Sequence, residues 1–488
     1  MNMKRISVAV AAAVLSAGAF AHGPSVTPDS EIWISGASAQ DKALAALFTD
    51  LCDAGTLDEF KDNANPSKPG KAHSAYFCTL SPANVPGLSA AQKVLLHKRS
   101  AGGSGQGVQP VADGVAIEAM AIDNGNCTET SAGSQDWRCT ISNPGDLENK
   151  VSDAGISDVE PALFVGPNVP PSSVPVTASQ LANIDVTSMN AVIFGVPVTE
   201  ALRDALQEVQ GLTVGAEDEA NMPSLSKSQV SSIISGATKD WDQFKVDNGG
   251  TIVGLASYPF TTAAAPTLEG PLSKPLVNVC RRVPGSGTQA QMNAKFNSSP
   301  CAAGANPTAL ASATNPFFGP IIVENSGSGD VSTCLNAADT AGKWAVGVQS
   351  LEKGADASGL TDQFRFVKVD GVAPTLENVA ANKYFDWVET TMQWRKAAAP
   401  VPGPTGDTLT IVQKIASDAS SPATINSLNV NFAHPFATNP GAYLALSTNG
   451  HTPSFPFDPT NPVATATHAF SGAPNSCSTP VSNTDSEL

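Results

Sequence analysis

The chain has 488 residues, with 27 lysines and arginines against 44 aspartates and glutamates, for a formal net charge of −17. A chain this acidic is poorly suited to nucleic acid or an anionic membrane surface, so we exclude both as partners. Its apolar share of 41% is that of a globular protein and not of a disordered one. The length exceeds one compact core, so two or more domains are expected.

The first 21 residues have the layout of a secretory signal peptide. Lys4 and Arg5 are followed by an apolar run that ends in the small residues of Ala19-Phe20-Ala21. The run is too short and wrongly flanked for a membrane anchor. We predict a cut after Ala21, which makes His22 the first mature residue and takes the net charge to −19. No later stretch is apolar and long enough to span a bilayer, so we expect a periplasmic or secreted chain.

Cysteine usage agrees with export. An even number of cysteines in an exported chain favours disulfides, and the absence of any C-x-x-C motif gives zinc or redox chemistry little support. The eight cysteines are Cys52, Cys78, Cys127, Cys139, Cys280, Cys301, Cys334 and Cys477. We predict four disulfides, with Cys52–Cys78 and Cys127–Cys139 as the local pairs. The remaining four cysteines allow three pairings, which the sequence leaves open.

A strand, a turn of small residues and a helix follow one another repeatedly along the chain. Residues 31–53 predict a strand and then a helix that Ser38 caps, with an apolar face on Leu44, Leu47, Phe48 and Leu51. Residues 94–122 repeat this plan with a glycine-serine turn.

The second half of the chain continues the alternation. Residues 223–244 predict a capped helix ending at Gly236, and residues 274–296 and 324–342 predict two more strand-turn-helix units. Strands alternating with helices predict an α/β fold. The part beyond Lys396 is rich in proline and predicts irregular structure. The expected core includes Trp241, Trp344 and Trp387.

Three glycine-serine turns stand before predicted helices, at residues 102–107, 284–288 and 326–330. Glycine permits close approach of the backbone to a ligand, and the free amides and dipole of a helix start favour an anion. Arg282 precedes the second turn and can form forked, charge-assisted bonds to an oxyanion. The pattern therefore predicts an oxyanion site. Arg281 is the alternative cation, and a ligand-free helix cap is the alternative use of each turn.

Several stretches, in order along the chain, resemble the substrate-binding protein of phosphate ABC transporters, a class II periplasmic binding protein. They are ISGASAQDKALAALF at 34–48, GSGQGV at 103–108, DAGISDVEP at 153–161, LSKSQVSSIISGATKDWDQF at 225–244, RVPGSGTQ at 282–289 and VDGVAPTLENVAANKYFDW at 369–387. The sequence departs from the family at Gln40-Asp41, where a Thr-Phe pair is usual, and at Pro284, where the family has an acid.

The resemblance implies an α/β, two-lobed class II periplasmic-binding-protein-like fold with a ligand cleft between the lobes. Beyond the signal peptide at 1–21, it implies that residues 22–190 begin lobe 1 and that 191–364 form lobe 2. Residues 365–488 complete lobe 1 and add the proline-rich tail.

The resemblance also assigns ligand-binding roles. Arg282 pairs with the oxygens of the anion, and Asp158 accepts a hydrogen bond from a protonated oxygen. A buried carboxylate repels an anion that carries no proton, which explains selectivity. The implied donors are Ser38, Gln40, Ser104, Ser286, Gly287 and Thr288.

The function implied is capture of a tetrahedral oxyanion, phosphate foremost, by closure of the lobes, with an ABC permease as partner. We expect no cofactor and no catalysis, because no nucleophile–base pair stands out. One alternative is an exported phosphatase-like enzyme on the same scaffold, for which Asp41 and Asp158 are the available acids. Another is a surface or structural protein that has lost its ligand. A third feature, a copper site at His22, has no flanking motif to support it. We expect Lys98 and Arg99 to be solvated.

Overall fold

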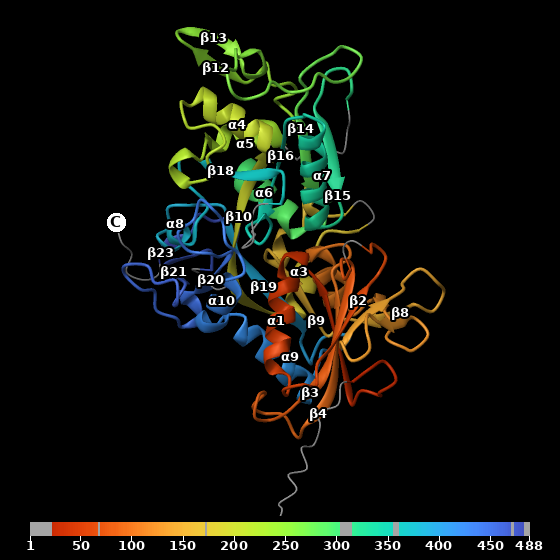
Figure 1. Ribbon diagram of the computed structural model, residues 1–488. Coiled ribbons are helices and arrows are strands. Elements are labelled where there is room, and N and C mark those ends of the chain that lie inside the picture. The colour runs from red at the N-terminus through yellow and green to blue at the C-terminus, as the bar shows by residue number, and fades with distance from the viewer. Residues whose placement is uncertain are drawn as a thin grey trace, which may run out of the picture.

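The computed structural model describes residues 22–66, 69–170, 173–302, 315–354, 361–469 and 473–482. The predicted signal peptide, residues 1–21, lies outside the described residues. Helices and strands alternate along the chain and form two lobes, one above the other in Figure 1. The α/β, two-lobed fold expected from the sequence is therefore confirmed, whereas the predicted lobe boundaries stay a prediction.

The sheet of the first lobe lies in the lower half of Figure 1. Neighbouring strands run in the order β6, β7, β2, β3, β4, β1, β9, β19, β10, β20 and β21. Their bounds are β1 Ser30–Gly36, β2 Asp58–Asp62, β3 His73–Leu80, β4 Gln92–Arg99, β6 Cys127–Glu129, β7 Asp136–Cys139, β9 Ala154–Ser157, β10 Ile184–Thr199, β19 Trp387–Arg395, β20 Tyr443–Leu446 and β21 Val463–Ala464.

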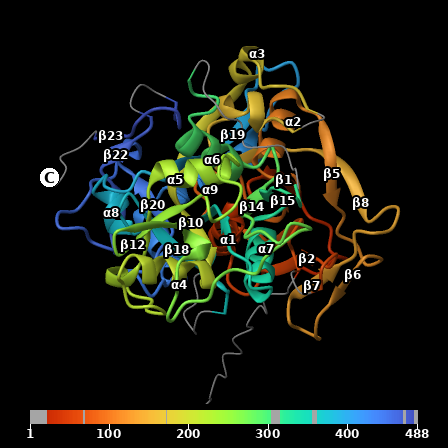
Figure 2. The same cartoon turned by 90° about the horizontal axis from the view of Figure 1, so that it is seen from above.

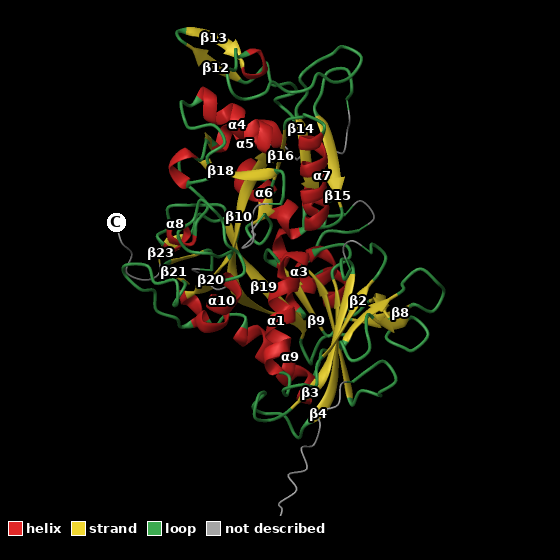
Figure 3. Ribbon diagram, viewed as in Figure 1, coloured by secondary structure: helices red, strands yellow, loops and turns green. Residues whose placement is uncertain are grey.

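Helices cover this sheet, as Figure 3 shows for α1 and α9. They are α1 Asp41–Leu51, α2 Gln109–Asp113, α3 Ala178–Ala182, α8 Leu376–Ala380, α9 Gly406–Asp418 and α10 Pro422–Asn429. The predicted apolar face of α1 is buried, because Leu44, Leu47 and Leu51 are each at most 3% exposed. Burying such a face stabilises a helix more than propensity does. A separate hairpin, β5 Ala116–Met120 with β8 Leu147–Val151, lies on the side of the molecule opposite α8 (Figure 2).

The second lobe is built on a smaller sheet in the order β15, β14, β16, β10, β18 and β11. The strands of this lobe are β11 Ser224–Leu225, β14 Asn278–Arg282, β15 Ile321–Asn325, β16 Ala345–Gly347, β17 Gln349–Ser350 and β18 Phe364–Val369. Its helices are α4 Glu200–Val209, α5 Lys227–Ile234, α6 Gly287–Asn297 and α7 Ser328–Thr340. A separate hairpin pairs β12 Lys245–Asn248 with β13 Thr251–Gly254. Trp241, Trp344 and Trp387 are fully buried, which confirms their place in the core.

Strand β10 belongs to both sheets. Its first part, Ile184–Ile193, pairs with β19, and its last residues, Val196–Thr199, pair with β18. The strand thus crosses from one lobe to the other near the middle of Figure 1.

Two local expectations are wrong. Ser38 does not cap α1: it starts a 3₁₀ turn, Ser38–Gln40, and Gln40 takes the N-cap position without a side-chain cap bond. The part beyond Lys396 is not irregular, because it contains α9, α10 and β20, and β20 pairs with β10. Prolines between these elements hid the helical spacing of Ile411, Val412 and Ile415, which are fully buried.

All eight cysteines are paired. Cys52–Cys78 and Cys127–Cys139 confirm the local predictions. The pairing left open is resolved as Cys280–Cys334 and Cys301–Cys477. The last of these closes a sequence separation of 176 residues and fastens the C-terminal segment to the second lobe.

Removing one disulfide should lower stability measurably. Cys127 and Cys139 face each other across β6 and β7, and their bond closes a 12-residue separation. Replacing both with alanine should lower the free energy of unfolding by about 3 kcal/mol, because the unfolded chain gains freedom. Denaturant unfolding measures this. Alkylation without reductant should find no free thiol in the native protein, and a labelled cysteine would contradict full pairing.

Candidate functional site

The three glycine-serine turns meet at the junction of the lobes. The turn at 102–107 belongs to the first lobe and forms a 3₁₀ turn at Ser104–Gly107, while the other two open α6 and α7. The amide of Gly105 donates to the carbonyl of Gly285 at 2.7 Å, which joins the first turn to the second. Arg282 joins the second turn to the third, since its Nη1 donates to Ser328 Oγ at 2.9 Å.

Arg282 is the last residue of β14 and is 2% exposed. The third turn wraps its guanidinium, because Nη2 donates to the carbonyl of Ser326 at 2.8 Å and Nε to that of Asn325 at 3.3 Å. Nη1 also reaches Ser38 Oγ of the first lobe at 3.5 Å. Burial lowers the pKa of Arg282, and the charge of Asp158 opposes that effect. A positive charge is therefore held in a fixed position between the lobes.

Arg281 lies on the other face of β14, as alternation along a strand requires. Its Nη2 donates to Glu324 Oε1 at 2.7 Å, forming an ion pair away from Arg282. Glu324 of the neighbouring strand β15 therefore neutralises the charge of Arg281.

Asp158 lies against the start of α6. Its backbone amide donates to Ser104 Oγ at 3.2 Å, and Thr288 Oγ1 donates to its Oδ2 at 3.5 Å. Gly287 allows this approach, because a Cβ there would overlap Ser104 Oγ and Asp158 Oδ2. The other carboxylate oxygen, Oδ1, is buried without a hydrogen-bond partner among the described residues.

Burial raises the pKa of Asp158 to about 6, and the charge of Arg282 only partly opposes this rise. The carboxyl is 2% exposed, so its charged form is short of solvation. Carboxylate, arginine and helix start together offer an acceptor and several donors within one buried volume. Such a set fits a small anion that carries both a negative charge and a proton.

The remaining predicted site residues are distributed as follows. Ser286 is the N-cap of α6, and its Oγ accepts from the amide of Gln289 at 3.5 Å. Ser38, Ser104, Asp158, Arg282, Ser286, Gly287 and Thr288 come together at the junction. Gln40 is 2% exposed and its Nε2 lacks a partner among the described residues. No hydrogen bond joins it to the other seven in that part of the chain.

Sequence reasoning missed the pairing of Lys98. Its ammonium is 1% exposed and lies 2.9 Å from Asp41 Oδ1, so the expectation of a solvated charge is wrong. Lys98 also donates to the carbonyls of Gly36 and Ala37. The acid at the start of α1 is therefore neutralised and does not repel an anion at the junction. Arg99 is also half-buried, with Nη1 donating to the carbonyl of Ala101.

A cavity of about 280 Å³ opens beside this group. Residues of both lobes line it, including Ser38 and Gly102 from the first and Ser326 and Gly327 from the second. A larger hollow of about 720 Å³ is lined by residues of β14, β15 and α7. The acids in its wall, Glu324 and Asp330, are already paired with Arg281 and Lys71. Of the residues around Arg282, only Asn325 and Ser326 line this hollow. Size alone therefore does not identify the site.

One ion pair joins the lobes beside the cavity. Lys71 Nζ of the first lobe lies 2.6 Å from Asp330 Oδ1 of α7 in the second. Both side chains are partly exposed, at 32% and 22%. An exposed pair of this kind contributes about 1 kcal/mol or less.

The Lys71–Asp330 pair should favour the closed arrangement of the lobes. Lys71→Ala should raise the radius of gyration of the ligand-free protein in small-angle scattering, since one contact between the lobes is lost. The control is Lys93→Ala, which removes a lysine paired with Asp29 within the first lobe. Equal scattering curves for the two variants would show that the pair does not hold the lobes together.

Within the described residues, no group of three or more histidine, cysteine, aspartate or glutamate side chains is placed to hold a metal ion. No helix of this part of the chain is both long enough and apolar enough to cross a membrane.

No family model matches the sequence, and no curated protein matches it significantly. Among solved structures, the protein is similar to a chain from Clostridium perfringens described as a phosphate ABC transporter substrate-binding protein with bound phosphate. The identity is 13%, the TM-score 0.38, and the match covers 80% of this chain and 96% of that one. It is also similar to an ABC-type phosphate transport receptor from Vibrio cholerae, at 13% identity and a TM-score of 0.36, covering 83% and 98%. PstS from Borrelia burgdorferi matches at 10% identity and a TM-score of 0.32, covering 80% and 93%.

Proposed function

We propose that the protein is an exported solute-binding protein that captures a tetrahedral oxyanion, phosphate in preference to others, between its two lobes. One observation carries the proposal. Two buried groups, the Arg282 guanidinium and the Asp158 carboxylate, lie at the start of α6, and one oxygen of that carboxylate has no hydrogen-bond partner among the described residues. A charge and a proton acceptor together suit an anion that still carries a proton.

Each site residue has a separate role in this proposal. Arg282 supplies the positive charge, and the hydroxyls of Ser38, Ser104, Ser286 and Thr288 donate to the oxygens of the anion. Gly287 leaves the amides at the start of α6 free to donate as well. Gln40, whose Nε2 is without a partner among the described residues, supplies a further donor once the anion is bound.

Capture proceeds by movement of the lobes about the strands that join them. Strand β10 runs through both sheets, and a bend at its middle changes the angle between the lobes. We propose that the loaded, closed form delivers its anion to an ABC permease after export to the periplasm. Four disulfides agree with an oxidising compartment.

A second candidate is a scaffold that has lost its ligand. Protein atoms accept hydrogen bonds from all three nitrogens of Arg282, and Asp158 lies where an anion would meet α6. In that case Asp158 serves as an internal substitute for the anion. Its raised pKa argues against this use, because a carboxylate that is well satisfied by a helix start has a lowered pKa.

Calorimetric titration with phosphate, arsenate, sulfate and molybdate tests the proposal. We expect heats for phosphate and arsenate and much weaker binding of sulfate. The ligand-free scaffold predicts no binding of any of the four. A chromogenic phosphate ester added to the same preparation tests the phosphatase alternative, which requires turnover.

A further inference from the structure

A buried carboxylate stands at the start of β2 in the first lobe, and it is not one of the residues gathered around Arg282. Asp58 is 1% exposed and begins the strand. Its Oδ1 accepts a hydrogen bond from Trp137 Nε1 at 2.7 Å, and its Oδ2 accepts one from the backbone nitrogen of His22 at 2.5 Å. No lysine or arginine of the described residues forms an ion pair with it. Burying a charge without a counter-charge costs free energy, so a cation beside this carboxylate would stabilise the fold.

The first described residue is seated firmly beside Asp58. The His22 ring packs against Phe77 with centroids 4.9 Å apart, and its Nε2 lies 2.9 Å from Thr79 Oγ1. Gly23 lies against the ring of Trp137, where an added Cβ would come within 3.2 Å. Backbone, side chain and neighbour thus fix the position of the His22 nitrogen.

We propose that export processing cuts the chain between Ala21 and His22, and that the new α-ammonium of His22 is the cation that pairs with Asp58. In the cut, an endopeptidase adds water across the peptide bond. Ala21 leaves as a carboxylate, and the freed His22 amine takes up a proton. The atom that the sequence marks as the mature N-terminus is therefore the same atom that the fold places against a buried acid.

The cut changes what this nitrogen can do. Before it, the nitrogen is a neutral amide that donates one hydrogen bond and leaves the charge of Asp58 uncompensated. After it, the nitrogen carries a positive charge, and charge-assisted hydrogen bonds are roughly twice as strong as neutral ones. Removal of the leader thus completes an ion pair inside the first lobe and stabilises the exported form over its precursor.

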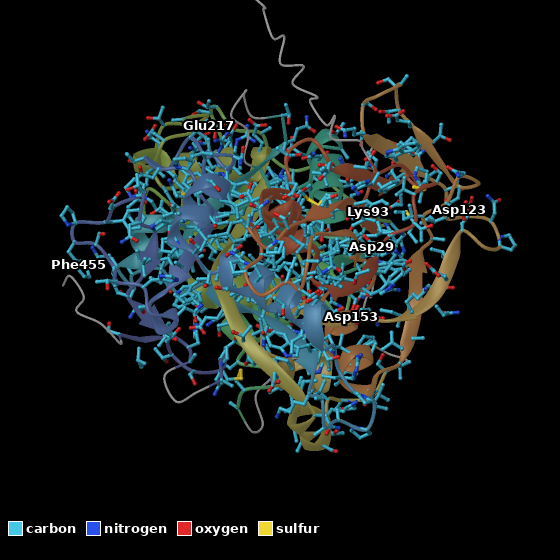
Figure 4. All side chains as sticks on the ribbon, turned by 90° about the horizontal axis from the view of Figure 1, so that it is seen from below. Asp29, Lys93, Asp123, Asp153, Glu217 and Phe455 are labelled. Carbon is cyan, nitrogen blue, oxygen red and sulfur yellow. A yellow bond between two sulfur atoms is a disulfide. The ribbon has the colours of Figure 1, made fainter. Side chains whose placement is uncertain are left out.

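The charges around the pair do not replace it. Burial raises the pKa of Asp58, with Glu129 adding to the rise, while the bonds from Trp137 and His22 lower it. Lys93 and Asp29 face His22, with opposite effects on its ring, and lie side by side in Figure 4. They are bonded to each other, because the Lys93 amide donates to Asp29 Oδ2 at 2.8 Å and its Nζ lies 4.0 Å from Oδ1.

The position of the cut is tested with the full chain exported from a Gram-negative host. N-terminal sequencing of the product should begin at His22. A product that begins at any other residue overturns the proposal, because a different atom would then face Asp58.

The ion pair is tested by the reactivity of the α-amine in the same product. An α-amine ordinarily has a pKa of about 7.7–8.0, and pairing with Asp58 raises it, which lowers the reactive fraction about tenfold for each unit at neutral pH. We expect wild type to be acylated at the N-terminus at least about tenfold more slowly than Asp58→Asn. The matched control is Asp29→Asn, which removes an exposed acid that is not hydrogen-bonded to the His22 nitrogen and should change the rate much less than Asp58→Asn does. Equal rates in wild type and Asp58→Asn refute the pair even if the cut is correct.

The stability readout uses an inserted glycine between Ala21 and His22, which turns the His22 nitrogen of the exported product into an amide. The Tm should fall by about 1–2 °C in the wild-type background. It should not fall in the Asp58→Asn background, because the two changes remove the same interaction. The difference should shrink above pH about 8, since a raised amine pKa contributes stability below its unfolded value and loses it as pH rises through the folded value. An equal loss in both backgrounds contradicts the proposal.

Discussion

Arg282→Ala should lower the affinity for phosphate by about 2–5 kcal/mol, which is roughly 30-fold to several thousand-fold in Kd. The guanidinium is buried at the end of β14, and its charge opposes the rise that burial causes in the pKa of Asp158. Without it, a bound anion would face Asp158 in a buried site with no counter-charge. Titration calorimetry at constant ionic strength measures the loss.

The adjacent arginine supplies a matched control. Arg281→Ala breaks an ion pair with Glu324 on the opposite face of β14 and should leave the affinity within a few-fold of wild type. Arg282→Lys keeps a charge but loses the forked guanidinium that donates to Ser326 and Ser328. Its affinity for phosphate should therefore lie between those of wild type and Arg282→Ala. Equal losses in Arg281→Ala and Arg282→Ala would mean that β14 is merely destabilised. Unchanged affinity in Arg282→Ala would disprove the site.

The local strand-turn-helix units were predictable because each is encoded by neighbours in the sequence. Ser286 caps α6 and Ser226 caps α5 with a full capping box, as the spacing of hydroxyl and amide residues indicates. Spacing alone also picked the pairs Cys52–Cys78 and Cys127–Cys139, which close short separations. Sequence patterns therefore predicted contacts between residues that lie close together along the chain.

The long-range partners were not accessible in the same way. Lys98 and Asp41 belong to different elements, and nothing in either local pattern shows that β4 ends beside the start of α1. The sequence predicts that residues 326–330 form a turn before a helix. Their contact with Arg282 exists because β14 and β15 are parallel neighbours in the sheet, which no local pattern shows. Residue 284 is a proline and offers this arginine no acidic partner. The carbonyls of Asn325 and Ser326 support it here instead.

Asp158→Asn should make the ligand-free protein more stable at neutral pH. In the fold the carboxyl has a pKa of about 6, against an ordinary value of 3.8, because of burial. Between these values the folded state holds a proton that the unfolded state has released, so stability falls as pH rises from about 4 to 6. Two pKa units correspond to about 3 kcal/mol at most, and asparagine removes this cost.

The comparison with wild type needs a pH series. Asp386, whose pKa burial raises to about 7, titrates in an overlapping range and remains in both proteins. Only the difference between the two unfolding curves therefore reports on Asp158. We expect that difference to vanish near pH 4 and to reach its full size above pH 6. If Asp158 serves only to cap α6, the variant should instead be less stable than wild type at every pH.

The same substitution should change which anion is preferred. An ionised Asp158 can accept a hydrogen bond only from an anion that carries a proton, and across the neutral range phosphate keeps one while sulfate keeps none. Wild type should therefore bind phosphate and arsenate well and sulfate weakly, because a like charge held against a buried carboxylate costs several kcal/mol. Asparagine removes the repulsion and offers an amide donor, so the affinity for phosphate should fall while the affinity for sulfate rises.

Titrations of both proteins with both anions at pH 7.5 give the ratio of the two affinities directly. A gain in stability together with a loss of discrimination identifies a residue kept for selection at the expense of the fold. A phosphate-to-sulfate ratio that is the same in both proteins would leave Asp158 without that role, whatever its effect on stability.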